Sequence, residues 1–334
     1  MEQASLAQRA TGEKVASVRA TAFVAKRLVF AIFLLLVVSF IVFSLQSLSK
    51  GSFVATVLGG RPASPEQVQQ VRDEFHLDDP LLVRYGMWLH DAARFDFGRS
   101  IKSDTSVTSA IAERLPVTLE LTVLTIVIVV LVGVPLGLIS GIRRGSFLDR
   151  FFTTTSVIGL SAPVFATGIF LLYVFGVYLG WFPAFGAGDG GLDRLRHLFL
   201  PAVALAATMV AIVARQTRAV TLDIMRQDFV TFARARGLGR RRVLVHYALR
   251  NVAVPVVTVT GLLLIYLIGG TILVEQVFSI EGLGKLMVSA VETTDIPVVQ
   301  GITLVFAVFV VLVTLAVDLL TMWIDPRTMY PAQG

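Results

Sequence analysis

The chain has 334 residues, of which 55% are apolar and only 16% are charged. A water-soluble domain of this length carries a larger polar share, so the composition predicts an integral membrane protein whose solvent is the lipid bilayer. The absence of cysteine excludes a disulfide framework, a thiolate nucleophile and a cysteine-ligated metal. In a membrane protein, the net charge of +6 fits basic cytosolic loops rather than a polyanionic partner.

Six stretches are long and apolar enough to cross a bilayer, which takes about 20 helical residues. They lie at about 28–48, 115–140, 151–182, 198–214, 252–274 and 296–323. The third contains Pro163, so we expect it to be kinked or tilted, and the fourth is the shortest, with 17 residues before Arg215. The predicted fold is an all-α integral membrane protein with six transmembrane helices.

Residues 1–27 form a polar tail before the first apolar stretch. A cleaved signal peptide over residues 1–50 is the alternative interpretation. It is disfavoured because the polar and apolar regions are both long and no small-x-small cleavage site follows. We therefore expect residues 28–48 to remain as the first transmembrane helix.

The charge of the loops predicts the orientation of the chain. The short loops 183–197 and 275–295 hold three Lys and Arg, whereas 17 lie in residues 1–27, 141–150 and 215–250. Because basic loops stay in the cytosol, both termini, including the tail 325–334, are predicted to be cytosolic. The expected location is the bacterial cytoplasmic membrane, which the chain crosses several times.

The long loop 49–114 is expected to form a small helical subdomain outside the membrane. Its first predicted helix starts with a capping box and a proline in the first turn, at Ser64, Pro65 and Gln67, and continues through Val68, Val71 and Phe75 at helical spacing. A second helix is predicted after Asp79-Pro80, with one face made by Leu82, Tyr85, Trp88 and Leu89.

The chain shows no convincing motif for catalysis, nucleotide binding or metal binding. Residues 282–285 read GLGK but lack the first glycine and the final Ser or Thr of a phosphate-binding loop, so a tight turn is expected there. No pair among His76, His90, His197 and His246 has metal-ligand spacing. We predict no catalytic residue, no metal site and no enzymatic activity for this chain.

Two charged residues fall inside predicted spans, Glu120 near the outer end of the second and Asp318 near the inner end of the sixth. A structural role is expected for both, such as pairing with a neighbouring helix. An ion-coupled secondary carrier usually places ionisable side chains or broken helices near the bilayer midplane, and the predicted midplanes here are uncharged. The carrier is therefore a weak alternative, and an intramembrane enzyme lacks its nucleophile or metal set.

The basic loop 215–251 gives the strongest functional signal. A positive loop can simply follow the orientation rule or bind anionic lipid. However, one face of the predicted helix is formed by residues at i, i+4 and i+8, namely Phe229, Ala233 and Gly237. The side chains on this face become smaller along the helix, which allows close approach to a partner. Gly237 is also expected to end that helix with a positive φ. The sequence thus predicts a cytosolic docking surface for a soluble partner.

Within this loop, FARARG at 232–237, followed after nine residues by YALRN at 247–251, is similar to the EAA-type coupling motif of ABC-importer permeases, although the leading Glu and closing Pro are absent. Other segments resemble the B-type permease subunit of dipeptide and oligopeptide importers, in the peptide/nickel branch. They are RLPVTLELT (114–122), LGWFPAFG (179–186), ARQTRA (214–219), VEQVFSIEGLG (274–284) and DIPVVQG (295–301).

The resemblance implies a type I ABC-importer permease fold with its core at 115–324. It also implies a second permease of similar fold in a heterodimer, two cytosolic ATPase subunits that hold ATP and Mg, an extracytoplasmic peptide-binding protein and surrounding membrane lipid, with no nucleic acid and no cofactor bound by this chain. The expected substrate is a di- or oligopeptide, with nickel or another small solute as the alternative. The residues implied in coupling to the ATPase are Asp228, Phe229, Phe232, Ala233, Arg234, Ala235, Gly237, Leu238 and Arg240.

Overall fold

The computed structural model describes residues 24–44, 54, 57–58, 64–74, 76–239, 242 and 249–324. Over these residues the predicted all-α fold is confirmed, and the only paired extended residues among them form one isolated bridge, Arg99 with Ser106. The expectations for Phe75, for Arg240 and for the tail 325–334 lie outside the described residues, as do those for most of the tail 1–27.

Five helices in the described part are long and apolar enough to cross a membrane, and a bent pair makes a sixth span if it is counted as one. They are Val24–Ser44, Val107–Ile142, Gly191–Ile224 (α9), Asn251–Val277 within α12 (Leu249–Val277), and Ile296–Ile324 (α14). No water reaches the bilayer core to satisfy backbone groups, so each crossing segment has to close its own hydrogen bonds as a helix.

The second span changes its helical geometry part-way. It consists of α5 (Val107–Ile128), a π-helical turn over Val129–Gly133 (η1) and α6 (Val134–Ile142). Pro135 follows the wide turn directly and has no N–H to donate to the preceding turn. A π-helical turn is one way for a membrane helix to accommodate such a proline without ending.

The third span is sharply bent at Pro163, where the sequence predicted a kink. Helix α7 (Phe147–Ser161) meets α8 (Val164–Leu171) and its π-helical extension η2 (Leu172–Tyr178) at 103°. Pro163 is the N-cap residue of α8 and has the extended angles typical of that position, with φ −60° and ψ 137°. Because it has no N–H, it cannot donate the hydrogen bond that would continue α7. The expected kink at Pro163 is therefore confirmed, and its angle of 103° breaks the span into two helices.

The fourth span is longer than predicted. Helix α9 has 34 residues, so the expectation of a short 198–214 helix was wrong, and the helix runs through Arg215 to Ile224. Charged residues do not end it because two of its arginines have acidic partners. Arg194 lies 3.4 Å from Glu120, and Arg218 lies 2.6 Å from Asp149. The connection after this span is correspondingly shorter than the predicted loop 215–251.

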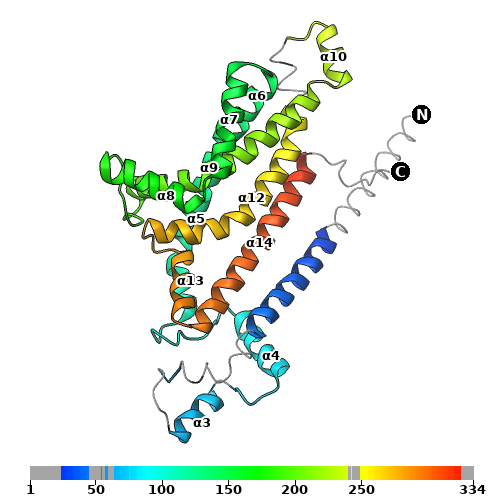
Figure 1. The fold of residues 1–334 in the computed structure, drawn as a ribbon. Helices are drawn as coiled ribbons and strands as arrows, with labels where there is room; N and C mark the ends of the chain where they lie inside the picture. The colour runs from blue at the N-terminus through cyan, green and yellow to red at the C-terminus, as the bar shows by residue number, and fades with distance from the viewer. Residues whose placement is uncertain are drawn as a thin grey trace, which may run out of the picture.

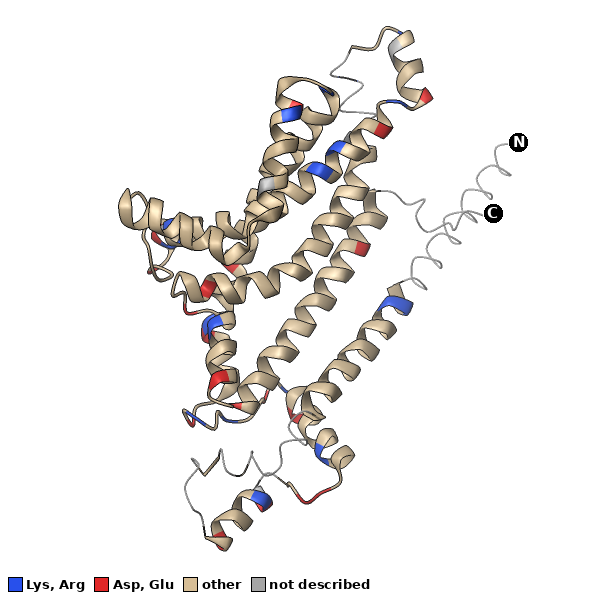
Figure 2. Cartoon of the chain, viewed as in Figure 1, with Lys and Arg blue, Asp and Glu red and all other residues tan. Residues whose placement is uncertain are grey.

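Two ends of the molecule can be distinguished (Figure 1). Helix α10 (Asp228–Ala235) lies at one end, whereas α3 (Pro65–Glu74), α4 (Leu81–Ala92) and α13 (Leu283–Glu292) lie at the opposite end; we call these the α10 end and the α4 end. Charged residues gather mainly toward these ends, and the middles of the long helices are almost uncharged (Figure 2). This distribution fits a bilayer around the middle of the bundle.

Helices α6 and α9 approach each other closely through two glycines. A Cβ atom added to Gly137 would lie 2.5 Å from Cβ of Thr217, and one added to Gly141 would lie 2.7 Å from Cβ of Thr221. Both glycines therefore have to lack a side chain. Small residues at a spacing of four are a common basis for helix packing in membranes, where no hydrophobic effect drives helices together.

The α4-end subdomain starts as predicted but packs differently. In the capping box, the Ser64 N–H donates to Oε1 of Gln67 at 3.0 Å and the Gln67 N–H donates to Oγ of Ser64 at 3.3 Å. Helix α4 follows Pro80. On the predicted face of α4, Leu82 is 72% exposed, whereas Arg84, which is not part of that face, is buried.

Aromatic contacts explain how α4 is oriented. The Tyr85 ring packs edge-on against Phe40 of the first helix, with ring centroids 5.2 Å apart, and Trp88 lies 5.6 Å from Phe43. These contacts turn the Tyr85–Trp88 side of α4 toward the first helix. The Asp295 carboxylate then joins the subdomain to the start of α14, because it accepts hydrogen bonds from the Ser100 hydroxyl and, at 3.2 Å, from the Ile101 N–H.

Candidate coupling site

Helix α10 ends in a glycine-dependent turn. Gly237 has a φ of +77°, as the sequence predicted, and the Leu238 N–H donates to the Ala233 carbonyl oxygen at 3.2 Å. This six-residue closure is the Schellman arrangement, in which a glycine adopts the left-handed conformation at low cost and satisfies the last carbonyls of the helix. Asp228 lies in the first turn, where a carboxylate is favoured by the helix dipole.

The buried side of α10 packs on the chain's own core. Val230 is 0% exposed and Ala233 is 4% exposed, and both belong to the main hydrophobic cluster, with Phe229 and Leu238 packed partly against it. The predicted docking face through Phe229, Ala233 and Gly237 therefore needs correction. Ala233 is small at a position where α10 approaches its own bundle, so it is not available as a contact for a partner.

The accessible side of α10 is centred on Phe232, which is 68% exposed. Asp228, Ala235 and Gly237 are exposed as well. Arg234 lies on the same short helix, whereas Arg240 lies outside the described residues. An exposed phenylalanine on a helix that projects beyond the bundle is typical of a residue that anchors a protein–protein interface. Aromatic side chains often contribute much of the binding energy of such interfaces. The assignment of these residues to coupling remains a prediction.

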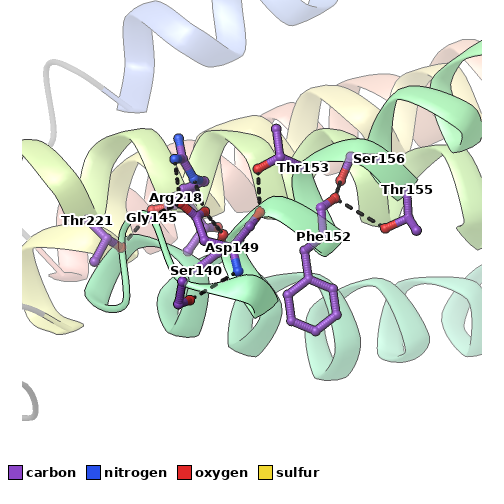
Figure 3. A network of polar contacts seen from close by, with 11 residues as sticks. Ser140, Gly145, Asp149, Phe152, Thr153, Thr155, Ser156, Arg218 and Thr221 are labelled. Atoms are coloured by element: carbon purple, nitrogen blue, oxygen red, sulfur yellow. Dashed lines mark hydrogen bonds and ion pairs between the residues drawn. The ribbon is translucent and has the colours of Figure 1, made fainter.

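A partly buried ion pair joins α7 to α9 (Figure 3). The Asp149 carboxylate accepts hydrogen bonds from Arg218 Nε at 2.6 Å and from Arg218 Nη2 at 2.9 Å. The Ser140 hydroxyl donates to Oδ1 of the same carboxylate, and the Gly145 N–H donates to Oδ2 at 2.9 Å. We call these four residues the Asp149 cluster. Its members come from α6, the turn that follows it, α7 and α9.

The Asp149 cluster fixes the geometry of α9 just before α10. A guanidinium that binds both oxygens of a carboxylate sets an orientation as well as a distance. Arg218 lies six residues before the end of α9 at Ile224, and α10 begins at Asp228. Val230 and Ala233 pack α10 onto the same bundle. A force on α10 would therefore reach α6 and α7 through packed contacts and this ion pair.

Sequence reasoning missed the Asp149 cluster, although a signal was present. Arg218 lies in ARQTRA, one of the segments that carried the family resemblance, but it was counted only as a basic loop residue. Asp149 falls in the segment 141–150, which the loop charges predict to be cytosolic. A carboxylate and an arginine 69 positions apart cannot be paired from one sequence.

The two intramembrane acids each lie beside an arginine of another helix. Arg194 Nη1 is 3.4 Å from Glu120 Oε1, and Arg27 Nε of the first helix is 3.0 Å from Asp318 Oδ2. These are the helix-to-helix pairs that a structural role for Glu120 and Asp318 requires. The first pair joins α5 to α9, and the second joins the first helix to α14.

A third acid, Glu275, was overlooked near the C-terminal end of α12. Glu275 is 0% exposed, accepts a hydrogen bond from the Thr118 hydroxyl at 2.7 Å and accepts another from the Lys285 N–H at 3.0 Å. The Leu283 N–H in turn donates to Thr118 Oγ1 at 2.9 Å. Glu275 and Thr118 thus hold the start of α13 against α5, so residues 282–285 begin a helix where only a turn was expected.

Comparisons with known proteins identify the family. Residues 133–330 match the family described as "Binding-protein-dependent transport system inner membrane component". Residues 20–122 match "Binding-prot-dependent transport system membrane comp, N-term". The chain belongs to this permease family. It is therefore a multi-pass membrane transport subunit rather than an enzyme, as the sequence predicted.

Relatives of the permease extend over nearly its whole length. It is 40% identical over 313 residues to a protein of Brucella abortus (strain 2308) named as a peptide transport system permease, an alignment that covers 93% of this chain and 99% of that protein. It is 38% identical over 308 residues to the glutathione transport system permease protein GsiC of Escherichia coli (strain K12), covering 92% and 99%.

Solved structures bear on the fold of the permease. A chain of the MetNI methionine ABC transporter in an inward-facing conformation superposes with a TM-score of 0.55 at 18% identity, covering 65% of this chain and 96% of that one. At this identity the likeness concerns the fold alone. It confirms the predicted ABC-importer permease fold.

Proposed function

We propose that this permease is one of two membrane subunits of an ATP-driven importer that translocates di- or oligopeptides. The support for the substrate is that the relatives at 38–40% identity are named for peptide and glutathione transport. The support for import is the family itself, whose description specifies dependence on a binding protein. The second membrane subunit is a permease of similar fold, so that the pair forms a heterodimer.

The observation that carries the mechanism is the projecting helix α10, with its buried side on the bundle and Phe232 exposed. We propose that two cytosolic ATPase subunits, which bind ATP and Mg, dock on the paired permeases at this end. ATP hydrolysis can be coupled to transport only if the inward- and outward-facing states of the permease bind the ATPases with different affinities. The rigid Asp149 cluster transmits the position of α10 to the helices of the bundle.

This proposal gives the permease a definite orientation. The α10 end lies in the cytosol, and the α4 end lies outside, where the extracytoplasmic binding protein delivers the peptide. The loop charges support it, because the basic loops and α10 belong to the same side. Reporter fusions test it: reporters at Gly145 and Gly239 are expected to be cytosolic, and those at Gly188 and Gly284 external. An external reporter at Gly239 would refute the orientation and the coupling role of α10.

Reconstitution tests the function. In proteoliposomes, the permease pair, the ATPase subunits and the binding protein together should take up peptide with ATP inside, and omission of any of them should abolish uptake. The permease purified alone should hydrolyse no ATP. Uptake of nickel but not peptide by the complete complex would exclude the proposed substrate. ATP hydrolysis by the permease alone would contradict the proposal that separate ATPase subunits hydrolyse the ATP.

A single substitution tests α10 as the docking element. Phe232→Ala removes the exposed anchor, and losing a central aromatic contact typically costs about 2 kcal/mol or more of binding energy. ATPase subunits should therefore co-purify with this variant much less than with the wild type. Phe147→Ala is the matched control, because Phe147 is 81% exposed but lies on α7. Equal co-purification of both variants would contradict docking through Phe232.

A further inference from the structure

The most unusual buried residue outside the candidate coupling site is Arg84, at the α4 end. It is only 5% exposed, and its Nε has no hydrogen-bond partner in the part of the chain that the structure describes. Among the same residues, no carboxylate lies within ion-pair distance of its guanidinium; the recorded contact is the Phe43 ring, whose centroid is 5.7 Å from Cζ. Burial lowers the pKa of Arg84, opposed by the charge of Asp79.

An arginine keeps its charge even under these conditions, because its pKa starts too high for it to deprotonate. A buried charge without a counter-charge is strongly disfavoured, and contact with one aromatic ring compensates only a small part of the lost hydration. Among the described residues, Asp79, Asp91 and Asp96 are the acids near Arg84, and none of them forms an ion pair with it. The guanidinium can therefore still pair with a carboxylate from another protein.

Arg84 lines a cavity that can admit such a group. The cavity has a volume of about 250 Å³ and is lined by the first helix, α4, the 96–99 turn and the start of α14, including Phe43, Trp88, Asp91 and Gln300. Pockets for small molecules usually measure about 300–1,000 Å³, so this one is better matched to a single side chain than to a peptide. Helix α4, which lines the cavity, lies at the end of the bundle opposite α10 (Figure 1).

The walls of the cavity favour a singly charged group. Asp91 and Asp96 line it together with Arg84, and Asp96 Oδ1 is already engaged by the Gly98 N–H at 2.9 Å. Arg99 and His76 also line it, but Arg99 pairs with Asp104 at 2.8 Å and His76 lies 3.4 Å from Asp79. These carboxylates repel a doubly charged anion such as phosphate more strongly than one carboxylate. A carboxylate also matches the planar fork of a guanidinium, with which it can form two charge-assisted hydrogen bonds.

We propose that the Arg84 cavity receives an aspartate or glutamate side chain of the extracytoplasmic binding protein when that protein docks. This inference rests on the proposed function, which places the α4 end outside the cell. In the docked complex, the incoming carboxylate pairs with the Arg84 guanidinium, and the apolar walls from Phe43 and Trp88 exclude water from the pair. Docking then depends on one acidic residue inserted at one place.

The experiment measures binding of the peptide-loaded binding protein to the complete importer in nanodiscs of zwitterionic lipid. Arg84→Gln should weaken binding by about 30-fold or more, because loss of one member of a desolvated charge pair is costly. Arg84→Lys keeps the charge without the fork and should weaken binding about 5-fold or more. Arg72→Gln is the control, since Arg72 is exposed on α3 and pairs with Asp78 at 3.2 Å, and it should bind within about 2-fold of wild type.

A second arm identifies the partner residue. Each surface Asp and Glu of the binding protein is changed to Asn or Gln and tested against the wild-type importer. One of these changes should reproduce the loss seen with Arg84→Gln, and combining the two should cause little further loss, which is the signature of a direct pair. If Arg84→Gln fails to assemble, Arg84→Lys and this second arm decide the question.

Three results would overturn the inference. The first is wild-type affinity of an assembled Arg84→Gln or Arg84→Lys importer that still takes up peptide, which leaves the proposed function intact. The second is an effect of Arg84 that occurs only in nanodiscs with anionic phospholipid, which would assign the cavity to a lipid phosphate. The third is peptide binding to the cavity without the binding protein. Failure of the wild-type importer to bind any binding protein would instead refute the proposed function.

Discussion

The buried pair between Asp149 and Arg218 gives the sharpest test of the structure. In Arg218→Gln, the Asp149 side chain, which is 5% exposed, keeps its charge but retains only the Ser140 hydroxyl and the Gly145 N–H as donors. Breaking a buried pair by removing one partner typically costs about 3–5 kcal/mol. The Arg218 side chain is 29% exposed, so the pair is partly solvated, and we expect a loss at the lower end, about 3 kcal/mol.

The two single variants should differ in a predictable direction. In Asp149→Asn, the guanidinium left behind can still reach water, so the loss should be nearer the cost of one unmade hydrogen bond, about 1–3 kcal/mol. The double variant should lose less than the sum of the singles, by about 0.5–3 kcal/mol, because the second change removes an orphaned partner. Reversible unfolding of the permease in mixed detergent micelles measures these free energies of unfolding directly.

Arg215→Gln is the control for this cycle, because Arg215 lies one turn away on α9 and is exposed. Its free energy of unfolding should stay within about 0.5 kcal/mol of wild type. The reasoning fails if Arg218→Gln is as mild as Arg215→Gln, or if the two single losses simply add. Either result would mean that the Asp149 carboxylate is satisfied without the guanidinium.

Three further substitutions follow from the packing. Gly137→Val should prevent stable assembly of the permease, because its Cβ would lie 2.5 Å from Thr217 Cβ. Gel filtration checks this, with Gly86→Val as the control, because a Cβ at Gly86 would meet nothing within 4 Å. Gly237→Val has the same open space but must hold a φ of +77°, so it should weaken α10 by about 1–2 kcal/mol and reduce ATPase co-purification. Glu275→Ala should leave the Lys285 N–H without its acceptor and lower thermal stability, whereas the exposed Glu292→Ala should not.

The spans show how much a single sequence can determine. Apolar length located the five spanning helices and the bent pair, although not the ends of α9, because a bilayer requires about 20 apolar residues with internally satisfied backbones. The capping box at Ser64 and the positive φ of Gly237 were also readable, since both follow from the local chemistry of a helix end. These are properties of a few adjacent residues and their solvent.

Charges inside the bundle were less readable. The boundaries of α9 were missed because the predicted span ends before Arg215, whereas the helix runs on to Ile224. Two arginines inside α9, Arg194 and Arg218, lie beside Glu120 and Asp149, and these acids are far away in the sequence. The glycines at 137 and 141 carried a readable spacing of four, but only the structure places them against Thr217 and Thr221.

The sequence by itself determined that this is an ABC-importer permease, where its membrane helices lie and which loop projects from them. Only the tertiary structure decided which face of each element is available. Ala233 belongs to the core and Phe232 to the surface, although both fit the helical pattern of α10. Arg84 is buried on a helix whose apolar Leu82 is exposed. Periodicity defines the faces of a helix, but the neighbour that covers one of them is set by packing between distant segments.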